Sequence, residues 1–163
     1  MREKSTASAF APATVANVAV GFDILGFAVS GLGEIATVKK IDNSNQVVVY
    51  PVKGYPNIST DPLLNTASAG LVRLIKEKNL DFGFSVKLLK KIPIGSGLGG
   101  SSTSAVATII AANALLEKKL SDPELLDYAL TGEEVASGAR HGDNVAPCLK
   151  GGLVFVPFLD HLN

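Results

Sequence analysis

The chain has 163 residues, 47% of them hydrophobic and 18% charged, which is the composition of a folded domain rather than of a disordered segment. Its 15 basic and 15 acidic residues leave no net charge, which disfavours nucleic acid or an anionic membrane as the main partner. The single cysteine excludes an internal disulfide, and neither a bilayer-spanning apolar run nor a secretory core is present, so we expect a cytoplasmic protein.

Six segments rich in small, β-branched and apolar residues predict strands. Their ranges are 8–19, 22–29, 34–41, 46–52, 83–89 and 151–157. The glycine-containing segment 30–33 separates the second strand from the third. Because strands come first and helices are interspersed without regular alternation, we predict an α+β fold.

Three helices are expected among and after these strands. Asp61 followed by Pro62 is a start signal for the first helix. Residues 101–116 are apolar almost all round, which predicts a helix in the centre of the domain. The segment 121–123, Ser-Asp-Pro, repeats the start signal for a helix over 124–130.

A run rich in glycine and hydroxyl residues joins the strand at 83–89 to the helix at 101–116. Glycines allow left-handed backbone angles, successive N–H groups can then face an anion, and the helix adds its positive end. The hydroxyls can bind phosphate oxygens or a metal ion. The run therefore predicts a phosphate-binding loop and a nucleotide ligand. Its candidate binding residues are Pro93, Gly95, Ser96, Gly97, Leu98, Gly99, Gly100, Ser101 and Ser102.

Neither of two better-known phosphate motifs fits this run. A Walker loop would need a lysine after its last glycine, and serines follow Gly100 instead. A dinucleotide fingerprint needs an acidic residue at the end of a second strand, but Glu117 lies in a helical stretch. A flexible linker is also disfavoured, because the run leads directly into a buried helix.

Three polar clusters could carry chemistry beside this loop. Asn17 and Asp23 could bind the amine or hydroxyl of a polar substrate, or could be ordinary turn residues. Glu133 or Glu134 could hold Mg²⁺, or could lie on a solvated helix face. Residues 140–147 mix polar and apolar side chains in a way more typical of a site than of a surface loop. Two histidines and one cysteine do not make a zinc ligand set, and Ser-His-Asp hydrolysis is disfavoured because the serines lie in the glycine-rich run and not in a Gly-x-Ser-x-Gly elbow.

These segments together resemble the GHMP small-molecule kinases. Residues 93–105 resemble the phosphate motif Pro-x-x-x-Gly-Leu-Gly-Ser-Ser of that family. Residues 10–23 and 141–147 resemble two motifs of its homoserine kinase branch, and the resemblance extends over residues 8–157. It implies a GHMP kinase N-terminal domain, with a fold like the second domain of a small-subunit ribosomal protein and a left-handed βαβ element. It also implies transfer of the γ-phosphoryl group of ATP to the side-chain hydroxyl of L-homoserine, a step toward threonine.

The resemblance also assigns roles by position. It implies that Ser101 and Glu133 hold Mg²⁺ and that residues 95–102 bind the triphosphate of ATP. Asparagine cannot accept the hydroxyl proton, so the branch pattern implies catalysis by positioning and charge stabilisation without a protein base. The implied substrate-side residues are Asn17, Asp23, His141 and Asn144, with His141 and Asn144 in the catalytic set.

Two departures from the family pattern bear on function. Gly100 stands where the first serine of the motif is usual, which removes one hydrogen bond to phosphate. Family members also continue into a C-terminal region with a second glycine-rich motif and arginines for the substrate carboxylate. We therefore expect residues 1–163 to be an N-terminal ATP-binding domain, cut before its C-terminal partner and weakly active or inactive alone.

Several alternatives stay open at this stage. Another GHMP kinase with a different small alcohol is one, and a non-catalytic nucleotide-binding domain is a second. RNA binding is disfavoured by the zero net charge and the few aromatic residues. Asn65 and Thr66 are weak candidates for adenine contacts, and the sequence permits a homodimer without requiring one.

Overall fold

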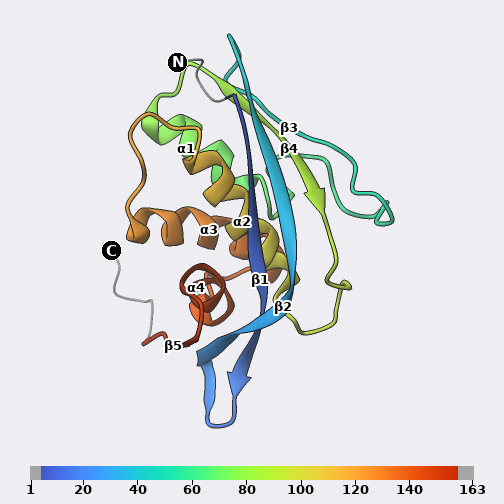
Figure 1. Ribbon diagram of the computed structural model, residues 1–163, viewed down its shortest axis with the longest axis vertical. Helices are drawn as coiled ribbons and strands as arrows, with labels where there is room; N and C mark the ends of the chain where they lie inside the picture. Colours follow the sequence, from blue (N-terminus) through green and yellow to red (C-terminus); the bar gives the residue numbers. More distant parts are fainter. Residues whose placement is uncertain (1–4, 158–163) are drawn as a thin grey trace.

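The computed structural model describes residues 5–157 as one mixed sheet with helices packed on one of its faces (Figure 1). The strand order is β1-β2-β4-β3, and β5 pairs with β2. The predicted α+β class is confirmed. In chain order the elements are β1 (Thr6–Val18), β2 (Gly21–Ile41), β3 (Val47–Val49), α1 (Ala69–Lys78), β4 (Gly83–Leu89), α2 (Gly100–Asn113), α3 (Asp122–Ser137), α4 (Gly142–Lys150) and β5 (Leu153–Phe155).

A long antiparallel hairpin of β1 and β2 forms one side of the sheet (Figure 1). The predicted break at residues 30–33 is wrong, because β2 is one continuous strand. Its partner in register changes from Pro12 opposite Gly33 to Ala13 opposite Val29, so three residues of β2 bulge out. A bulge absorbs extra residues without ending the strand, which the glycine-rich sequence alone did not distinguish from a turn.

The strands β3 and β4 are parallel and are joined through α1, which gives the βαβ element implied by the resemblance. Strand β3 covers only Val47–Val49 instead of the predicted 46–52, and Pro51 follows shortly after its end. Proline lacks the N–H that a continuing ladder would need. The remaining antiparallel pairs place β2 between β1 and β4.

The first helix begins later than its start signal predicted. Asp61 accepts a hydrogen bond from the backbone N–H of Leu63 at 2.9 Å, and Asn65 accepts one from Ala67 at 2.9 Å. Such side-chain bonds to the backbone favour turns over helix, so α1 begins only at Ala69. The turns before α1 therefore remain outside the helix and form one wall of the site described below.

Helix α2 is the central helix, as its composition predicted, although it ends at Asn113 instead of residue 116. Most of its side chains are buried, and Val106 and Ile109 pack in one core cluster with Phe84 and Val86 of β4. A helix that is buried on most sides needs no polar face. The core therefore lies between α2 and the sheet.

Helices α3 and α4 differ most from the sequence prediction. A capping box of Ser121 and Glu124 confirms the predicted start of α3, but the helix continues to Ser137 rather than ending at Leu130. It passes through Gly132, where a Cβ atom would lie 2.2 Å from the carbonyl oxygen of Thr66. Only glycine permits that close approach of two backbones.

Helix α4 was not predicted, because its sequence contains Pro147 and shows a mix of polar and apolar residues without a helix start signal. Proline has no N–H to donate to the carbonyl of Asp143, four residues earlier. That carbonyl instead faces β2 at Gly26, where a Cβ atom would lie only 1.8 Å from its oxygen. The start of α4 therefore rests directly on the backbone of β2.

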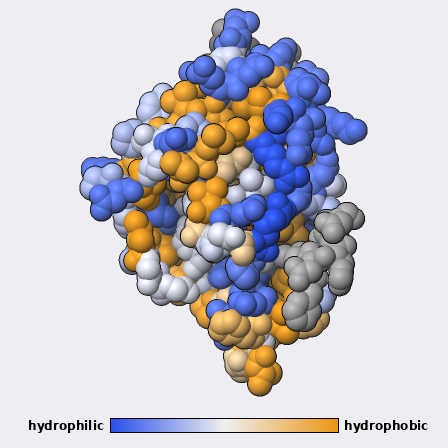
Figure 2. Space-filling view, turned by 180° about the vertical axis from the view of Figure 1, so that it is seen from behind, coloured by the Kyte–Doolittle hydropathy of each residue, from blue (hydrophilic) through white to orange (hydrophobic). Residues whose placement is uncertain are grey.

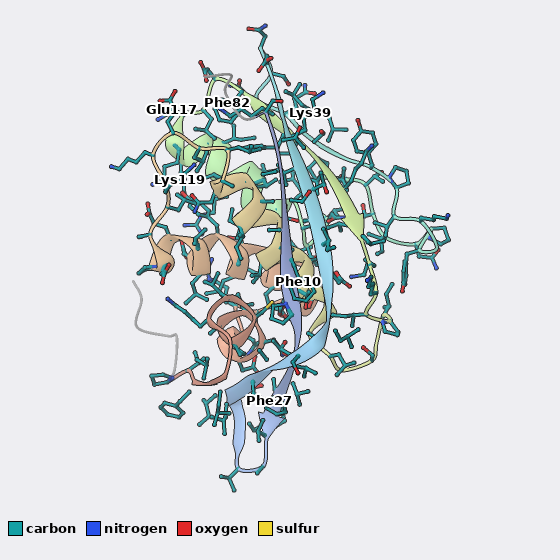
Figure 3. All side chains as sticks on the ribbon, viewed as in Figure 1. Phe10, Phe27, Lys39, Phe82, Glu117 and Lys119 are labelled. Carbon is teal, nitrogen blue, oxygen red and sulfur yellow. The ribbon has the colours of Figure 1, made fainter. Side chains whose placement is uncertain are left out.

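The far end of the β1–β2 hairpin exposes apolar side chains. Val20 is fully exposed and Phe22 is 70% exposed, and this end of the molecule is orange in Figure 2. Phe27 lies on the same arm in Figure 3, opposite Leu153 of β5 in the register. Among residues 5–157, none of the helices combines the length and apolarity needed to cross a bilayer.

Candidate active site

A cavity of about 600 Å³ opens beside the start of α2, which is within the usual size range of small-molecule sites. The loop 92–101 forms one wall, and the turns before α1 contribute residues 57–59 and 64–66. Ala16 and Asn17 of β1 and Asn144 of α4 complete the lining. The cavity thus brings together parts of the chain that are far apart in sequence.

The predicted phosphate-binding loop has the backbone that its glycines suggested. Gly95, Gly97 and Gly99 have φ angles of 76°, 72° and 63°, in the left-handed region. Gly99 is the N-cap residue of α2, and Gly100 and Ser101 in its first turn line the cavity. The first N–H groups of a helix have no partner within it and favour anions. The loop is therefore suited to bind phosphate.

Glu133 faces the start of α2 rather than solvent. Its Oε2 accepts hydrogen bonds from Ser101 Oγ at 2.9 Å and from Ser102 Oγ at 2.7 Å. The side chain is buried, which excludes the solvated-face alternative for this residue, whereas Glu134 is exposed. Ser101 also lines the cavity, but Ser102 is fully buried beneath it. Glu133 and Ser101 therefore approach the place where phosphates would bind.

The oxygens of Ser101 and Glu133 are a donor set that fits Mg²⁺. This ion prefers hard oxygen ligands and is typically held by one or two carboxylates together with phosphate oxygens and water. Within the described part of the chain, no group of three or more His, Cys, Asp or Glu side chains could form a dedicated metal cage. A single carboxylate beside a phosphate-binding loop is consistent with a metal that arrives with a nucleotide.

The predicted substrate-side residues only partly converge on the cavity. Asn17 and Asp23 lie on the β1–β2 hairpin with left-handed φ angles of 59° and 58°, and the N–H of Asp23 donates to Asn17 Oδ1 at 2.9 Å. Both lie within the strands, Asn17 near the end of β1 and Asp23 near the start of β2, and only Asn17 lines the cavity. On α4, Asn144 lines the cavity, while His141 is the N-cap residue and does not.

Thr14 is a site residue that the sequence did not single out. Its side chain is fully buried, and its Oγ1 donates to Asn144 Oδ1 at 2.8 Å. Its backbone N–H donates to the carbonyl of Leu98 in the loop at 3.2 Å. Thr14 therefore connects β1 to both the loop and α4. A threonine in a strand gives no local signal of this role.

A buried ion pair beneath the loop was also not predicted. Lys90 Nζ lies 2.7 Å from Glu34 Oε1, and both side chains are almost completely buried. Lys90 also donates to the carbonyl of Gly100 at 3.3 Å and to Ser104 Oγ at 3.0 Å, and Ser104 Oγ donates to Glu34 Oε2 at 2.6 Å. These bonds tie the first turn of α2 to β2 and to the end of β4.

Asp143 lies within the predicted cluster 140–147, but no role was predicted for it from the sequence. Burial raises the pKa of its carboxyl above the ordinary value of 3.8, the N–H of Asn144 opposes this shift, and the charge of Asp23 adds to it. The folded state therefore binds a proton at Asp143 more tightly than the unfolded state does. The stabilisation that comes from protonated Asp143 is fully present below pH 3.8. The free energy of unfolding falls as pH rises from 3.8 through the higher folded-state pKa, because the buried carboxyl then ionises.

We expect Asp143→Asn to become more stable relative to the unsubstituted chain as pH rises from about 3 to about 7, because it removes the ionisation that burial disfavours. The asparagine can still accept the hydrogen bond that the N–H of Asn144 donates at 3.0 Å. Urea unfolding of both chains at a series of pH values measures the difference. Parallel stability curves would show that Asp143 does not titrate abnormally.

Known proteins resemble this chain in sequence over almost its whole length. Residues 65–152 match the family described as GHMP kinases N terminal domain. A homoserine kinase from Xylella fastidiosa is 49% identical over 149 residues, which cover 91% of this chain and 46% of that protein. A homoserine kinase from Chloroherpeton thalassium is 38% identical, with coverage of 94% and 51%. The chain thus spans about half the length of the curated relatives it matches.

Solved structures also resemble this chain over almost its whole length. The crystal structure of homoserine kinase from Cytophaga hutchinsonii has a TM-score of 0.91 and 41% identity, and the match covers 98% of this chain and 51% of that one. A mevalonate kinase from Staphylococcus aureus has a TM-score of 0.65 at 16% identity, covering 94% and 53%, and shows likeness of fold alone. With the family match over residues 65–152 and these relatives, the chain belongs to the GHMP kinase family.

Proposed function

We propose that this chain is the ATP-binding part of an enzyme that phosphorylates the side-chain hydroxyl of L-homoserine to O-phospho-L-homoserine. The observation that carries the proposal is one cavity lined by the glycine-rich loop, Asn17 and Asn144. Relatives up to 49% identical bear the name homoserine kinase. On this proposal the enzyme acts in the cytoplasm, in threonine biosynthesis.

In this proposal the loop holds the triphosphate of ATP. Its N–H groups at the start of α2 favour the phosphate charge, and the hydroxyl of Ser101 lies at the same wall. Glu133 and Ser101 would hold Mg²⁺, which neutralises negative charge on the phosphates when it is bound. The nucleoside of ATP would then lie against the other wall of the cavity, which the turns before α1 form with Asn65 and Thr66.

The acceptor would lie between Asn17 and Asn144, with Asp23 on the same hairpin as Asn17 and His141 at the N-cap of α4. The amide of Asn144 is neutral and cannot take up the hydroxyl proton. The chain's residues would therefore contribute by positioning the hydroxyl in line with the γ-phosphate and by favouring the charge of a loose transition state. The proton would pass to the phosphate itself.

The domain assignment is part of the proposal. Residues 1–163 would form the N-terminal, ATP-binding domain, and the C-terminal half of the relatives' length would supply the ligands of the substrate carboxylate. Support comes from the match of the chain to about half of each relative. The same half-length match favours a second candidate, a nucleotide-binding domain without catalysis.

The experiment compares ADP release by this chain with ADP release by the chain extended through a C-terminal half like that of its relatives. Each is given Mg-ATP with L-homoserine, mevalonate or galactose. Turnover by the extended chain with L-homoserine alone is the expected result. ATP binding with no ADP release for any acceptor would instead support the non-catalytic candidate, and turnover with another alcohol would replace the substrate.

A further inference from the structure

We propose that Thr14 is a positioning residue for Asn144, which it orients so that the amide N–H donors face the cavity and the amide oxygen does not. This inference rests on the proposed phosphoryl transfer and deepens it. It gives Asn144 a defined chemistry, donation of hydrogen bonds to oxygens of the transferred phosphoryl group or of the acceptor hydroxyl.

The geometry around Asn144 fixes its amide on one side. Oδ1 accepts the hydrogen bond from Thr14 Oγ1 at 2.8 Å. A Cβ atom on Gly99 would lie 2.9 Å from the same Oδ1 and 2.1 Å from Thr14 Oγ1, so the oxygen is enclosed by Thr14 and the loop backbone. Since Asn144 also lines the cavity, the part of its amide left for a ligand is Nδ2.

The opposite orientation of the amide would leave a buried hydroxyl without an acceptor. Thr14 is fully buried, and among the described residues Asn144 is the only hydrogen-bond partner of its hydroxyl. If Nδ2 faced Thr14, the hydroxyl could accept a bond but its own hydrogen would have no partner. A buried polar hydrogen without a partner destabilises the folded state, which favours the orientation with Oδ1 toward Thr14.

An amide donor suits this place in the cavity. The adjacent loop and helix start favour anions, so an oxygen that gains negative charge during phosphoryl transfer would meet Nδ2 as well as backbone N–H groups. Thr14 is also bonded to the loop through its backbone N–H and the carbonyl of Leu98. One residue thus sets both the amide orientation and its distance from the loop.

The test combines substitutions at the two positions in the extended chain. Thr14→Val keeps the β-branched shape and removes the hydroxyl, so we expect kcat with L-homoserine to fall about tenfold while ATP affinity stays within about twofold. Thr14→Ser retains the hydroxyl and should recover most of kcat. In an Asn144→Ala background, Thr14→Val should have no further effect on kcat, because Thr14 acts through Asn144.

Thr108→Val is the matched control, because Thr108 on α2 is equally buried, its hydroxyl has no partner among the described residues, and it is absent from the cavity lining. This control should leave kcat unchanged. Independent effects of Thr14→Val and Asn144→Ala that simply multiply would overturn the inference, as would equal losses in the valine and serine variants.

A second readout does not depend on the acceptor. The side-chain amide signals of Asn144 are identified in a ¹⁵N spectrum by their loss in Asn144→Ala, and they should move in Thr14→Val but not in Thr108→Val. Unmoved signals would contradict the inference even if no alcohol is phosphorylated. If the signals move and no alcohol tested is phosphorylated, the orientation of the amide stands and the proposed acceptor is wrong.

Discussion

Replacing Glu133 by glutamine is expected to reduce ADP release by the extended chain about 100- to 1,000-fold, the range measured when one charge-stabilising group is removed from an enzyme site. Glutamine has nearly the same shape and can still accept hydrogen bonds from Ser101 and Ser102, at 2.9 and 2.7 Å in the native structure. The lost quantity is therefore the negative charge beside the loop. The measurement is kcat at saturating ATP over a series of Mg²⁺ concentrations.

The neighbouring Glu134→Gln is the matched control. Glu134 is exposed, and its partner is Arg140 on the surface, with 3.9 Å between the charged atoms. The same chemical change at this position should leave turnover and its Mg²⁺ dependence as they were. Nucleotide affinity with and without Mg²⁺ gives a second readout, since Glu133→Gln should weaken only the Mg²⁺-dependent part. Equal behaviour of the two variants would remove Glu133 from the metal site.

Lys90→Met is expected to lower the free energy of unfolding by about 3–5 kcal/mol, because it leaves the carboxylate of Glu34 buried without its opposite charge. Glu34 is fully buried and Lys90 is 7% exposed, so water cannot replace the lost partner. Ser104 alone would remain bonded to the carboxylate. Urea unfolding followed by circular dichroism measures the loss. The glycine-rich loop should also bind ATP more weakly, because the first turn of α2 loses its hydrogen bonds to Lys90.

Removing both charges separates the ion pair from simple packing. In Glu34→Gln with Lys90→Met, no charge is left in the core, and most of the lost stability should return. Lys78→Met is the matched surface change, because its partner Glu124 is exposed to water at a comparable 2.6 Å, and we expect little effect there. A double variant as unstable as Lys90→Met would show that shape, and not the uncompensated charge, controls stability.

Local chemistry made some features predictable from sequence. The loop was predictable because left-handed turns need glycine, and all three loop glycines with positive φ were among the predicted residues. The buried nature of α2 followed from its apolar composition, and the start of α3 from Ser121 and Glu124. In each case a short stretch of chain carries the physical cause.

Other features depend on contacts that no short stretch contains. Thr14 and Asn144 are 130 positions apart, and Ser101 and Glu133 are 32 apart, so their hydrogen bonds follow only from the folded topology. The predicted end of α3 was wrong because Gly132 does not end the helix. The glycine is needed there because the backbone carbonyl of Thr66, far away in the sequence, packs against it. The roles of His141, Asp23 and the domain boundary remain predictions.

The contact between Gly26 and the carbonyl of Asp143 has a consequence for how this scaffold can change over evolution. At its start the helix that carries Asn144 contacts β2 through the backbone of Asp143, and the ring of Pro147 lies beside the same glycine. We therefore expect substitutions in the cavity lining to leave the spacing of this helix and strand unchanged as long as Gly26 is kept. New acceptor alcohols could be accommodated by substitutions in the lining, while position 26 itself would tolerate almost none.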